Sequence, residues 1–509
     1  MVTILDSTND TSVNSLSYSD LHFGRQRIIL DYTEVTPQNV IEVLNKALEI
    51  HDKNKSDCEY LIKYVLGNQD ILKRSESQTS SINNKVVVNY AWASTREIVG
   101  YTLGNPIELT AIDMDDRKDV DTLNKVYNYE ESFVVDTDAA TYGSICGLGY
   151  YITLPSTDIT KDNTPEVPIV YDYLDPRYTF VVQSTEVTNP QIMSCHYIET
   201  DEGVTYTCYT DKYKMVVKDL ESVTSTVNPI GLDPITMLEN SLFLTGDWEQ
   251  AISVMNASNI VASDSLNDIE GTIRSLLVIL GAELDEDDDT SLTKIKTNRL
   301  LQLFASNGNV GSGVLDAKFI SPTLDSTSTQ NIRDYLDEVR NIITGIPDRE
   351  GNGIGGDTGA AVLNRNGWTD IEIVAKLKEL FIKKAKKRQL SVAIAILKKL
   401  NMVSDGLLAS DIDVNIERHR MDGLSDRVNA FAALVGTGEL ATIDCLELTG
   451  ITNRASEMVE RGKKAKEENA EQNSNPAILI NDTNNTVTDT VDTTETVKDT
   501  TKVVEENKE

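Results

Sequence analysis

The segment GDWEQAISVMNASNIVASDSLNDIEGTIRSLLVIL, residues 246–280, carries apolar residues at the spacing of one long helix. Apolar side chains that recur every three or four residues fall on one face of a helix. They are Trp248, Ile252, Met255, Ile260, Ile269, Ile273, Leu276 and Leu277. A single helix of about 30 residues would be roughly 45 Å long, which is unusual in a globular protein. The pattern therefore predicts a strut.

The strut is followed by an insert and then by a second helix. The insert, residues 281–326, contains an acidic run and two strand-like pieces, LLQLF and GVLDAKFI. Residues 328–343 again show helical spacing of apolar side chains. The acidic run Asp285–Asp289 lacks the glycine and the glutamate that a calcium-binding EF-hand loop needs at its sixth and twelfth positions, so we expect a solvated turn.

Residues before the strut predict a mixed helical and β body of the α+β class. Thr36-Pro37 is typical of a helix start, and helical spacing continues to residue 50 and again over residues 57–73. Residues 86–88 and 107–111 are predicted to be strands, and residues 91–103 to be a helix. Residues 130–220 are predicted to be mostly β, through SFVVDT, YGSICGLGYYITL, TFVVQST, MSCHYIET, VTYTCYT and KMVVKD.

A glycine-rich segment, GIPDREGNGIGGDTGAA (345–361), follows the second helix, and its G351-N-G353-I-G355-G356 matches G-x-G-x-x-G. A dinucleotide-binding loop of that pattern follows a strand, whereas a helix is predicted here. No G-K-[ST] accompanies it, which excludes a Walker loop. We therefore expect a flexible loop between helices, in which glycine supplies unusual backbone conformations. Gly345-Ile346-Pro347 should end the preceding helix.

Composition narrows the functional classes. The formal net charge of the 509 residues is −34, and such a chain should not bind duplex DNA through its overall field, although it could surround DNA. The five cysteines lack metal-ligand spacing, and the four histidines are scattered, so we expect no disulfide framework, no metal, no cofactor and no catalytic residues. The longest apolar run, residues 392–397, is too short for a bilayer, and we expect a protein made in the cytosol with no membrane contact.

One basic segment, KLKELFIKKAKKRQ (376–389), stands out against the acidic background. A solvated helix face is the simpler interpretation. The alternative is a surface that contacts DNA phosphates without reading sequence. Its candidates are Lys383, Lys384, Lys386, Lys387 and Arg388.

The order of these pieces resembles the portal proteins of tailed double-stranded-DNA bacteriophages, of the long-tailed siphophage type found in phages of Gram-positive hosts. The resemblance lies in four stretches, which together span about residues 35–400. They are YLIKYVLGNQDILKR (60–74), NNKVVVNYAWASTREIVGYTLGNPIEL (83–109), NPIGLDPITMLENSLFLTGDWEQAISVMNASNIVASDSLNDIE (228–270) and ITGIPDREGNGIGGDTGAAV (343–362). In the last one, Thr358 replaces a serine of the family's pattern.

This resemblance implies a ring of about twelve copies around an axial channel. The implied parts are an N-terminal arm (1–29), an α/β wing (30–245), a stem helix (246–275), a small α/β clip (276–327), a second stem helix (328–344), a tunnel loop (345–362), a helical crown (363–470) and a disordered acidic tail (471–509). The tunnel loop would place Asp348, Arg349, Gly351, Asn352, Gly353, Ile354, Gly355 and Gly356 next to DNA. An acidic channel lining would keep DNA from adhering, and its candidates are Asp264, Asp268 and Glu270.

The resemblance also implies a function without catalysis. The ring would sit at one capsid vertex of the virion, after assembly in the host cytoplasm, and pass double-stranded DNA during packaging and ejection. Its partners would be the large terminase, a head-completion adaptor protein, and the major capsid and scaffold proteins. The alternatives are another structural virion protein, such as a minor capsid or scaffold protein, and a nucleotide-binding enzyme that uses the glycine segment.

Overall fold

The computed structural model of the chain describes residues 17–75, 82–156, 168–273, 276–280, 300–303, 316–320, 326–347, 368–418, 424–438, 440–449, 451, 458–459 and 461–466. The chain forms two compact units, Met1–Met421 and Asp422–Glu509. All strands among the described residues belong to the first unit. The fold is a mixture of helices and sheets, in agreement with the predicted class.

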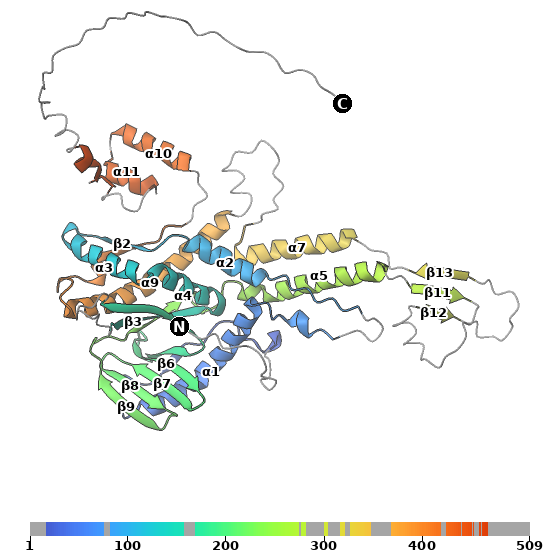
Figure 1. Cartoon of the computed structure of the whole chain (residues 1–509), viewed down its shortest axis with the longest axis horizontal. Helices are drawn as coiled ribbons and strands as arrows, with labels where there is room; N and C mark the ends of the chain where they lie inside the picture. The colour runs from blue at the N-terminus through green and yellow to red at the C-terminus, as the bar shows by residue number, and fades with distance from the viewer. Residues whose placement is uncertain are drawn as a thin grey trace, which may run out of the picture. The chain divides into compact units, whose positions relative to one another are not determined.

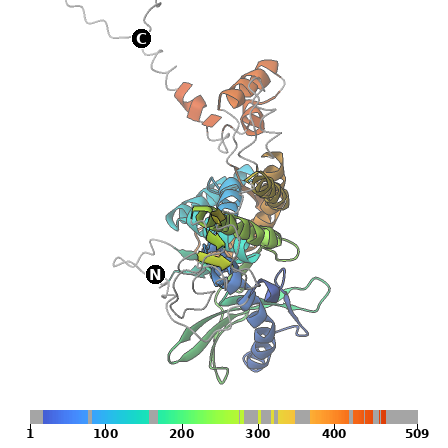
Figure 2. The ribbon, with the colours of Figure 1, turned by 90° about the vertical axis from the view of Figure 1, so that its right-hand side faces the viewer.

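A six-stranded sheet forms one part of the first unit (Figure 1). Its strands, in spatial order, are β1 (Ile28–Leu30), β5 (Thr179–Ser184), β6 (Gln191–Thr200), β7 (Gly203–Tyr209), β8 (Tyr213–Lys218) and β9 (Ser222–Val227). β1 and β5 are parallel, and the other neighbours are antiparallel. The N-terminal half of helix α1 (Val40–Val65) buries its apolar side chains against one face of this sheet (Figure 2).

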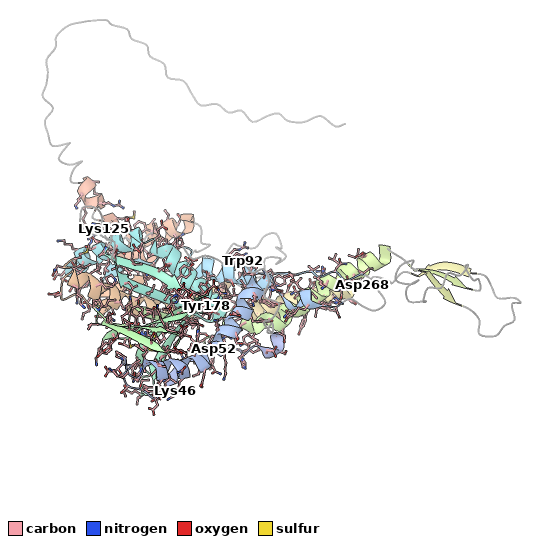
Figure 3. The ribbon with its side chains drawn as sticks, turned by 60° about the horizontal axis from the view of Figure 1, so that its bottom comes forward. Lys46, Asp52, Trp92, Lys125, Tyr178 and Asp268 are labelled. Atoms are coloured by element: carbon pink, nitrogen blue, oxygen red, sulfur yellow. The ribbon has the colours of Figure 1, made fainter. Side chains whose placement is uncertain are left out.

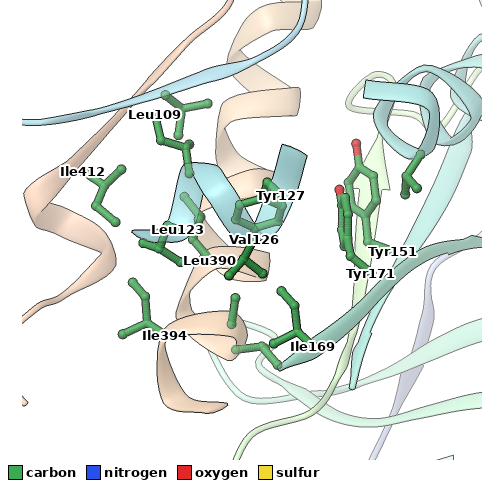
Figure 4. Close-up of a cluster of buried hydrophobic side chains, with 14 of the residues drawn as sticks. Leu109, Leu123, Val126, Tyr127, Tyr151, Ile169, Tyr171, Leu390, Ile394 and Ile412 are labelled. Carbon is green, nitrogen blue, oxygen red and sulfur yellow. The ribbon is translucent and has the colours of Figure 1, made fainter. Parts of the chain in front are cut away.

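A second, three-stranded antiparallel sheet holds the largest core. Its strands are β10 (Ile235–Glu239), β3 (Leu148–Pro155) and β4 (Ile169–Leu174). Around it lie α2 (Tyr90–Thr102), α3 (Arg117–Tyr129), α4 (Ser132–Cys146), α9 (Trp368–Lys399) and the pair formed by β2 (Glu108–Ala111) and β14 (Ile412–Asn415). Figure 4 shows that side chains of α3, α9, the three-stranded sheet and the β2–β14 pair meet in this core, where Leu123, Tyr151 and Leu390 are fully buried.

Helix α4 corrects the prediction that SFVVDT (132–137) and the first part of YGSICGLGYYITL (142–154) are β-structure. Residues 132–146 are helical, and β3 begins only after Gly147, which has φ +84° and donates its N–H to Gly143 O at 2.8 Å. Strand β3 then passes so close to α4 that a Cβ at Gly149 would lie 2.4 Å from Ala139 O. Because α4 packs against other elements on several sides, its sequence lacks the polar stripe by which a surface helix is recognised.

Two further predictions are corrected in the N-terminal part. Helix α1 is one continuous helix of 26 residues, not two helices with a break after residue 50. Residues 86–88 join no sheet, and the extended segment 82–89 lies instead along the next long helix. The predicted helix at 91–103 and the strand at 107–111 are confirmed by α2 and β2.

The predicted strut is helix α5 (Ile252–Ile273), and the returning helix is α7 (Ser326–Thr344), which contacts α5 along its length (Figure 1). Between them, β11 (Leu276–Leu280) pairs with β12 (Leu300–Leu303) in parallel and with β13 (Asp316–Ile320) in antiparallel fashion. The two strand-like pieces of the insert are thereby confirmed. The prediction of helix through residue 280 is wrong, because a five-residue apolar run has no periodicity that separates strand from helix.

Short 3-10 turns complete the first unit, and the described part of the second is mostly helical. The turns are η1 (Tyr18–Asp20), η2 (Asp70–Lys73), η3 (Met114–Asp116), η4 (Glu249–Ala251) and η6 (Ala409–Asp411). In the second unit, α10 (Leu424–Thr437) packs on α11 (Thr442–Thr449). Helix α9 belongs to the first unit, whereas the sequence-based division grouped it with these C-terminal helices. Among the described residues, no helix is long and apolar enough to cross a membrane.

His51 gives the first unit a pH-dependent stability. Its ring is buried on α1 beside Phe180, with centroids 4.7 Å apart, and burial lowers its pKa to about 4. An unfolded histidine binds a proton below about pH 6.5, so the folded state loses stability as pH falls from there toward 4. Between pH 7 and pH 5 the loss should be about 2 kcal/mol, measured as the free energy of unfolding in urea.

His51→Phe should remove this part of the pH dependence. Arg177 O, which His51 Nε2 contacts at 3.1 Å, keeps the hydroxyl donor of Tyr197 at 3.0 Å in the variant. An equal decrease between pH 7 and pH 5 in both proteins would show that His51 is not the group responsible.

Candidate functional site

The site is the pair of long helices, and its base is η4, the 3-10 turn that leads directly into α5. Trp248, just before that turn, is fully buried. Its ring stacks on Tyr64 of α1 at 5.6 Å, and its Nε1 donates to Thr95 Oγ1 of α2 at 2.9 Å. A buried tryptophan with a satisfied N–H combines a large apolar contact with one fixed orientation. The helix therefore starts from a point held by two other helices.

Glu249 fixes the same turn through a buried ion pair. Its Oε1 accepts from Arg25 Nη2 at 2.7 Å and from Gly24 N at 2.8 Å, and its Oε2 accepts from Gly246 N at 2.8 Å. The side chains of Glu249 and Arg25 are both 0% exposed. Burial raises the pKa of Glu249, while the charge of Arg25 and the two N–H donors lower it. The carboxylate thus joins the N-terminal segment to the start of the strut.

One face of α5 carries polar side chains that hold the extended segment 82–89, called the strap below. Three acceptors on the helix, four residues apart, receive alternate backbone N–H groups of the strap. The bonds join Asn259 Oδ1 to Val88 N, Ser263 Oγ to Val86 N and Asn267 Oδ1 to Asn84 N, at 2.8, 2.9 and 2.8 Å. The helix therefore satisfies backbone donors that a neighbouring strand would satisfy in a sheet.

The three acidic candidates of α5 lie near the far end of this face. Asp264 Oδ1 accepts from Arg74 Nη1 at 2.6 Å, and Glu270 Oε2 accepts from Asn84 Nδ2 at 3.0 Å. Asp268 is exposed (Figure 3). Asp264 and Glu270 are thus engaged by neighbouring segments of the same chain, and the Arg74–Asp264 pair is itself partly exposed.

Helix α7 returns to the base of α5 and is fixed there. It contacts η4, and Arg340 places its guanidinium 3.6 Å from the ring centre of Tyr90 at the start of α2. The helix ends at Thr344, as predicted, because Gly345 takes φ +68°. A Cβ at Gly345 would lie 2.7 Å from Val374 Cγ2 of α9. The predicted DNA-facing residues 348–356 lie outside the described residues, as does the acidic run 285–289.

Large apolar side chains remain exposed on both long helices. They are Ile260, Leu266 and Ile269 on α5, and Ile332, Tyr335, Ile342 and Ile343 on α7. Their exposure ranges from 41% for Ile343 to 73% for Ile342. Several exposed apolar side chains on neighbouring helices mark interaction sites more often than single ones do.

The five basic candidates lie on the middle of α9, but they differ in environment. Lys383 pairs with Glu379 at 2.9 Å, and Lys384 pairs with Glu239 of β10 at 2.9 Å. Lys387 is partly buried, and Arg388 is exposed at the rim of an open cavity of about 550 Å³ beside β10. Within the described part of the chain, no ion pair involves these last two side chains.

Lys386 differs from its neighbours because its side chain is in the core, only 2% exposed. Its Nζ donates to both carboxylate oxygens of Asp136 at 2.9 and 3.0 Å and to Tyr171 Oη at 3.1 Å. It also lies 4.7 Å from the ring centre of Tyr127. Burial lowers the pKa of Lys386, and the charge of Asp136 raises it. In this chain the ammonium therefore links α9 to α4 and β4 and does not reach the surface.

Sequence reasoning missed the ion pairs that anchor the site. Besides Arg25 and Glu249, Lys378 of α9 binds Asp247 Oδ2 and Asn240 Oδ1, both at 2.6 Å, just before α5. The only signal was the G-D-x-E pattern at 246–249, which marks the helix start but not its partners. Among the described residues no group of side chains could hold a metal ion, and Asp113, Asp115 and Asp116 form only an acidic turn.

Comparison with known proteins assigns the family. The family described as "Phage portal protein, SPP1 Gp6-like" matches residues 44–472, which is most of the chain. The chain therefore belongs to this family of phage portal proteins, a structural family and not a family of enzymes.

Individual relatives are distant. No curated protein matches the chain. A chain from the neck of an empty gene transfer agent particle, computed with C6 symmetry, has 13% identity and a TM-score of 0.41, covering 71% of this chain and 90% of that one. A chain from the virion of a native gene transfer agent particle has 12% identity and a TM-score of 0.42, covering 78% and 94%. The assignment rests on the family match alone.

Glu249→Gln tests whether the buried ion pair holds the base of the strut. Removing one charge of a buried pair leaves the other uncompensated, which costs about 3–5 kcal/mol. We expect the free energy of unfolding in urea to fall by that amount. Glu42→Gln is the matched control, because Glu42 forms an exposed pair with Lys46 and the variant should unfold at the wild-type midpoint. Equal behaviour of the two variants would contradict the anchoring role.

Proposed function

We propose that this chain is a portal subunit that forms a closed ring of about twelve copies around an axial channel for double-stranded DNA. The ring would occupy one vertex of a virion. It would admit DNA during packaging and release it at ejection. The chain would act as a conduit without its own catalysis, cofactor or metal.

The observation that carries this proposal is the helical pair α5 and α7, with its fixed base and its exposed apolar side chains. A buried ion pair and a buried tryptophan hold the start of this helix, and a fixed start sets the direction of the whole helix. Exposed apolar residues on both helices need a cover, and head-to-tail contacts between copies provide one and close into a ring. Membership of the portal family supports the same assembly.

In this proposal the parts of the chain keep the roles that the resemblance implies. The wing would be 30–245, the stem 246–275 and 328–344, the clip 276–327, the tunnel loop 345–362 and the crown 363–470. Because α9 packs within the first unit, its residues 368–399 would serve the wing core and not only the crown. The partners would be the large terminase, a head-completion adaptor protein, and the major capsid and scaffold proteins.

In this proposal, acidic and basic side chains would have different roles toward DNA. Asp268 is the acidic candidate whose exposure suits a channel lining that repels phosphates. The glycines of the tunnel loop would let the backbone approach DNA closely. Lys387 and Arg388 are the basic candidates best placed to contact phosphates, because no ion pair within the described residues engages them.

Ring formation is tested by native mass spectrometry and negative-stain class averages of the full-length chain. We expect rings of about a dozen copies with a central hole. Ile342→Asp, at an exposed apolar position of α7, should shift the population toward smaller species. Ile112→Asp is the control, since Ile112 is 66% exposed but lies outside the helical pair. A protein that stays monomeric at high concentration, alone and with a scaffold protein, would favour another virion role.

The basic candidates are tested by the salt dependence of duplex DNA binding, measured by fluorescence anisotropy. Each lost phosphate contact lowers the slope of log affinity against log salt by about 0.9. The double variant Lys387→Gln, Arg388→Gln should therefore show a slope smaller by about 1–2 than the wild type. Lys53→Gln, an exposed lysine of α1, should not change it. An unchanged slope in the double variant would remove these two residues from the proposed DNA surface.

A further inference from the structure

Strand β9 ends the six-stranded sheet with an edge that nothing in the described part of the chain covers. It pairs with β8 on one side, and the strand order stops there (Figure 1). Five of its six residues are exposed, and Val227 is 76% exposed. The opposite edge, β1, is only three residues long and contacts α1. One edge of the sheet is therefore short and in contact with a helix, whereas the other is exposed along most of its length.

The backbone pattern shows which groups of β9 point outward. Asn228 N donates to Lys212 O at 2.8 Å, so the pair of residues 212 and 228 is hydrogen-bonded. Such pairs alternate along an antiparallel ladder, which assigns Thr226, Thr224 and Ser222 to the bonds with β8. The N–H and C=O groups of the residues between them point away from β8. Those residues are Val223, Ser225 and Val227.

The composition of β9 lacks the usual protection of a free edge. Natural edge strands carry lysine, proline, a bulge or an inward-pointing charge that prevents pairing with other chains. The sequence SVTSTV has no charge and no proline, and its register with β8 is unbroken. Its β-branched residues favour extended structure. An edge of this kind is a template for one more strand.

The side chains around the edge define what that strand would carry. On the face that packs toward α1, Val223 joins the core and Val227 extends the apolar row, which suits apolar residues at alternate positions. On the other face, Lys214 and Lys218 of β8 lie opposite Thr226 and Ser222. No ion pair in the described residues engages either lysine, although Lys214 Nζ also lies 5.7 Å from the Tyr209 ring centre.

A strand added to β9 would run about 10 Å from β8, two strand spacings away. A lysine side chain and a carboxylate can meet across that distance, over the short hydroxyl side chains of β9. We propose that the β9 edge binds an extended, acidic segment of another protein chain, with valine-like residues alternating with aspartate, glutamate or threonine. Pairing of β9 with β9 of a second copy is disfavoured. It would place Lys214 and Lys218 of both copies on one face of the joined sheet, where no carboxylate of either strand would offset their repulsion.

The probe is a blocked eight-residue peptide in which valine alternates with aspartate, labelled for anisotropy and added to the full-length protein. Ser225→Pro removes an outward N–H without touching the β8 ladder, and Ser225→Thr is the matched control that keeps it. The proline variant loses this backbone hydrogen bond, and its ring disturbs the pairing of the two strands, so it should bind the peptide about tenfold more weakly. The threonine variant should bind as the wild type does. Ser225→Lys, an inward-facing charge, gives a second test should the proline variant fold poorly.

Hydrogen exchange at single-residue resolution supplies the structural readout. Bound peptide should slow exchange at the amides of Val223, Ser225 and Val227, while Thr224 and Thr226 stay as they were. A peptide with lysine in place of aspartate should bind about tenfold more weakly at low salt. The proposal is overturned if the acidic peptide leaves the three amides unchanged, or if Ser225→Pro binds it as well as wild type. Native mass spectra showing paired assemblies that Ser225→Pro separates would instead assign the edge to a second copy.

Discussion

The burial of the turn that leads into α5 is the constraint on which the candidate site depends. A carboxylate and a guanidinium without solvent contact tolerate little displacement, since each is costly to bury alone. Glu249 and Arg25 therefore hold the start of the strut against the N-terminal segment, and Trp248 holds it against α1 and α2. The direction of α5, the course of the strap and the return of α7 all follow from that fixed point.

Much of the helical framework could be predicted from sequence, because it depends on local signals. Apolar spacing and the Gly345–Pro347 breaker define α7, and apolar spacing defines the middle of α5. Helix α4 and strand β11 could not be predicted in the same way. Apolar residues surround α4 on several sides, and β11 is a uniform apolar run, so neither shows the periodicity that distinguishes helix from strand.

The burial and the ion-pair partners of the charged residues in the site could not be predicted from sequence. Lys386 and Lys387 are adjacent in a basic run, yet the first is buried in the core with Asp136 and the second is only partly buried. Arg25 and Glu249 are separated by 224 residues. A sequence gives the sign of each charge, whereas the partner that neutralises it is set by packing between distant segments. The resemblance to portal proteins, by contrast, rests on the order of motifs and was confirmed by the family match.

The strap has a consequence for how this protein can change over evolutionary time. Acceptors four residues apart on α5 recur about every 6 Å, and alternate N–H groups of an extended chain recur about every 7 Å. Exchange among asparagine, serine, aspartate and glutamine at residues 259, 263 and 267 would keep an acceptor in place. Insertion or deletion of one residue would rotate every later acceptor by about 100° around the helix. This region should therefore drift by substitution while its length stays fixed.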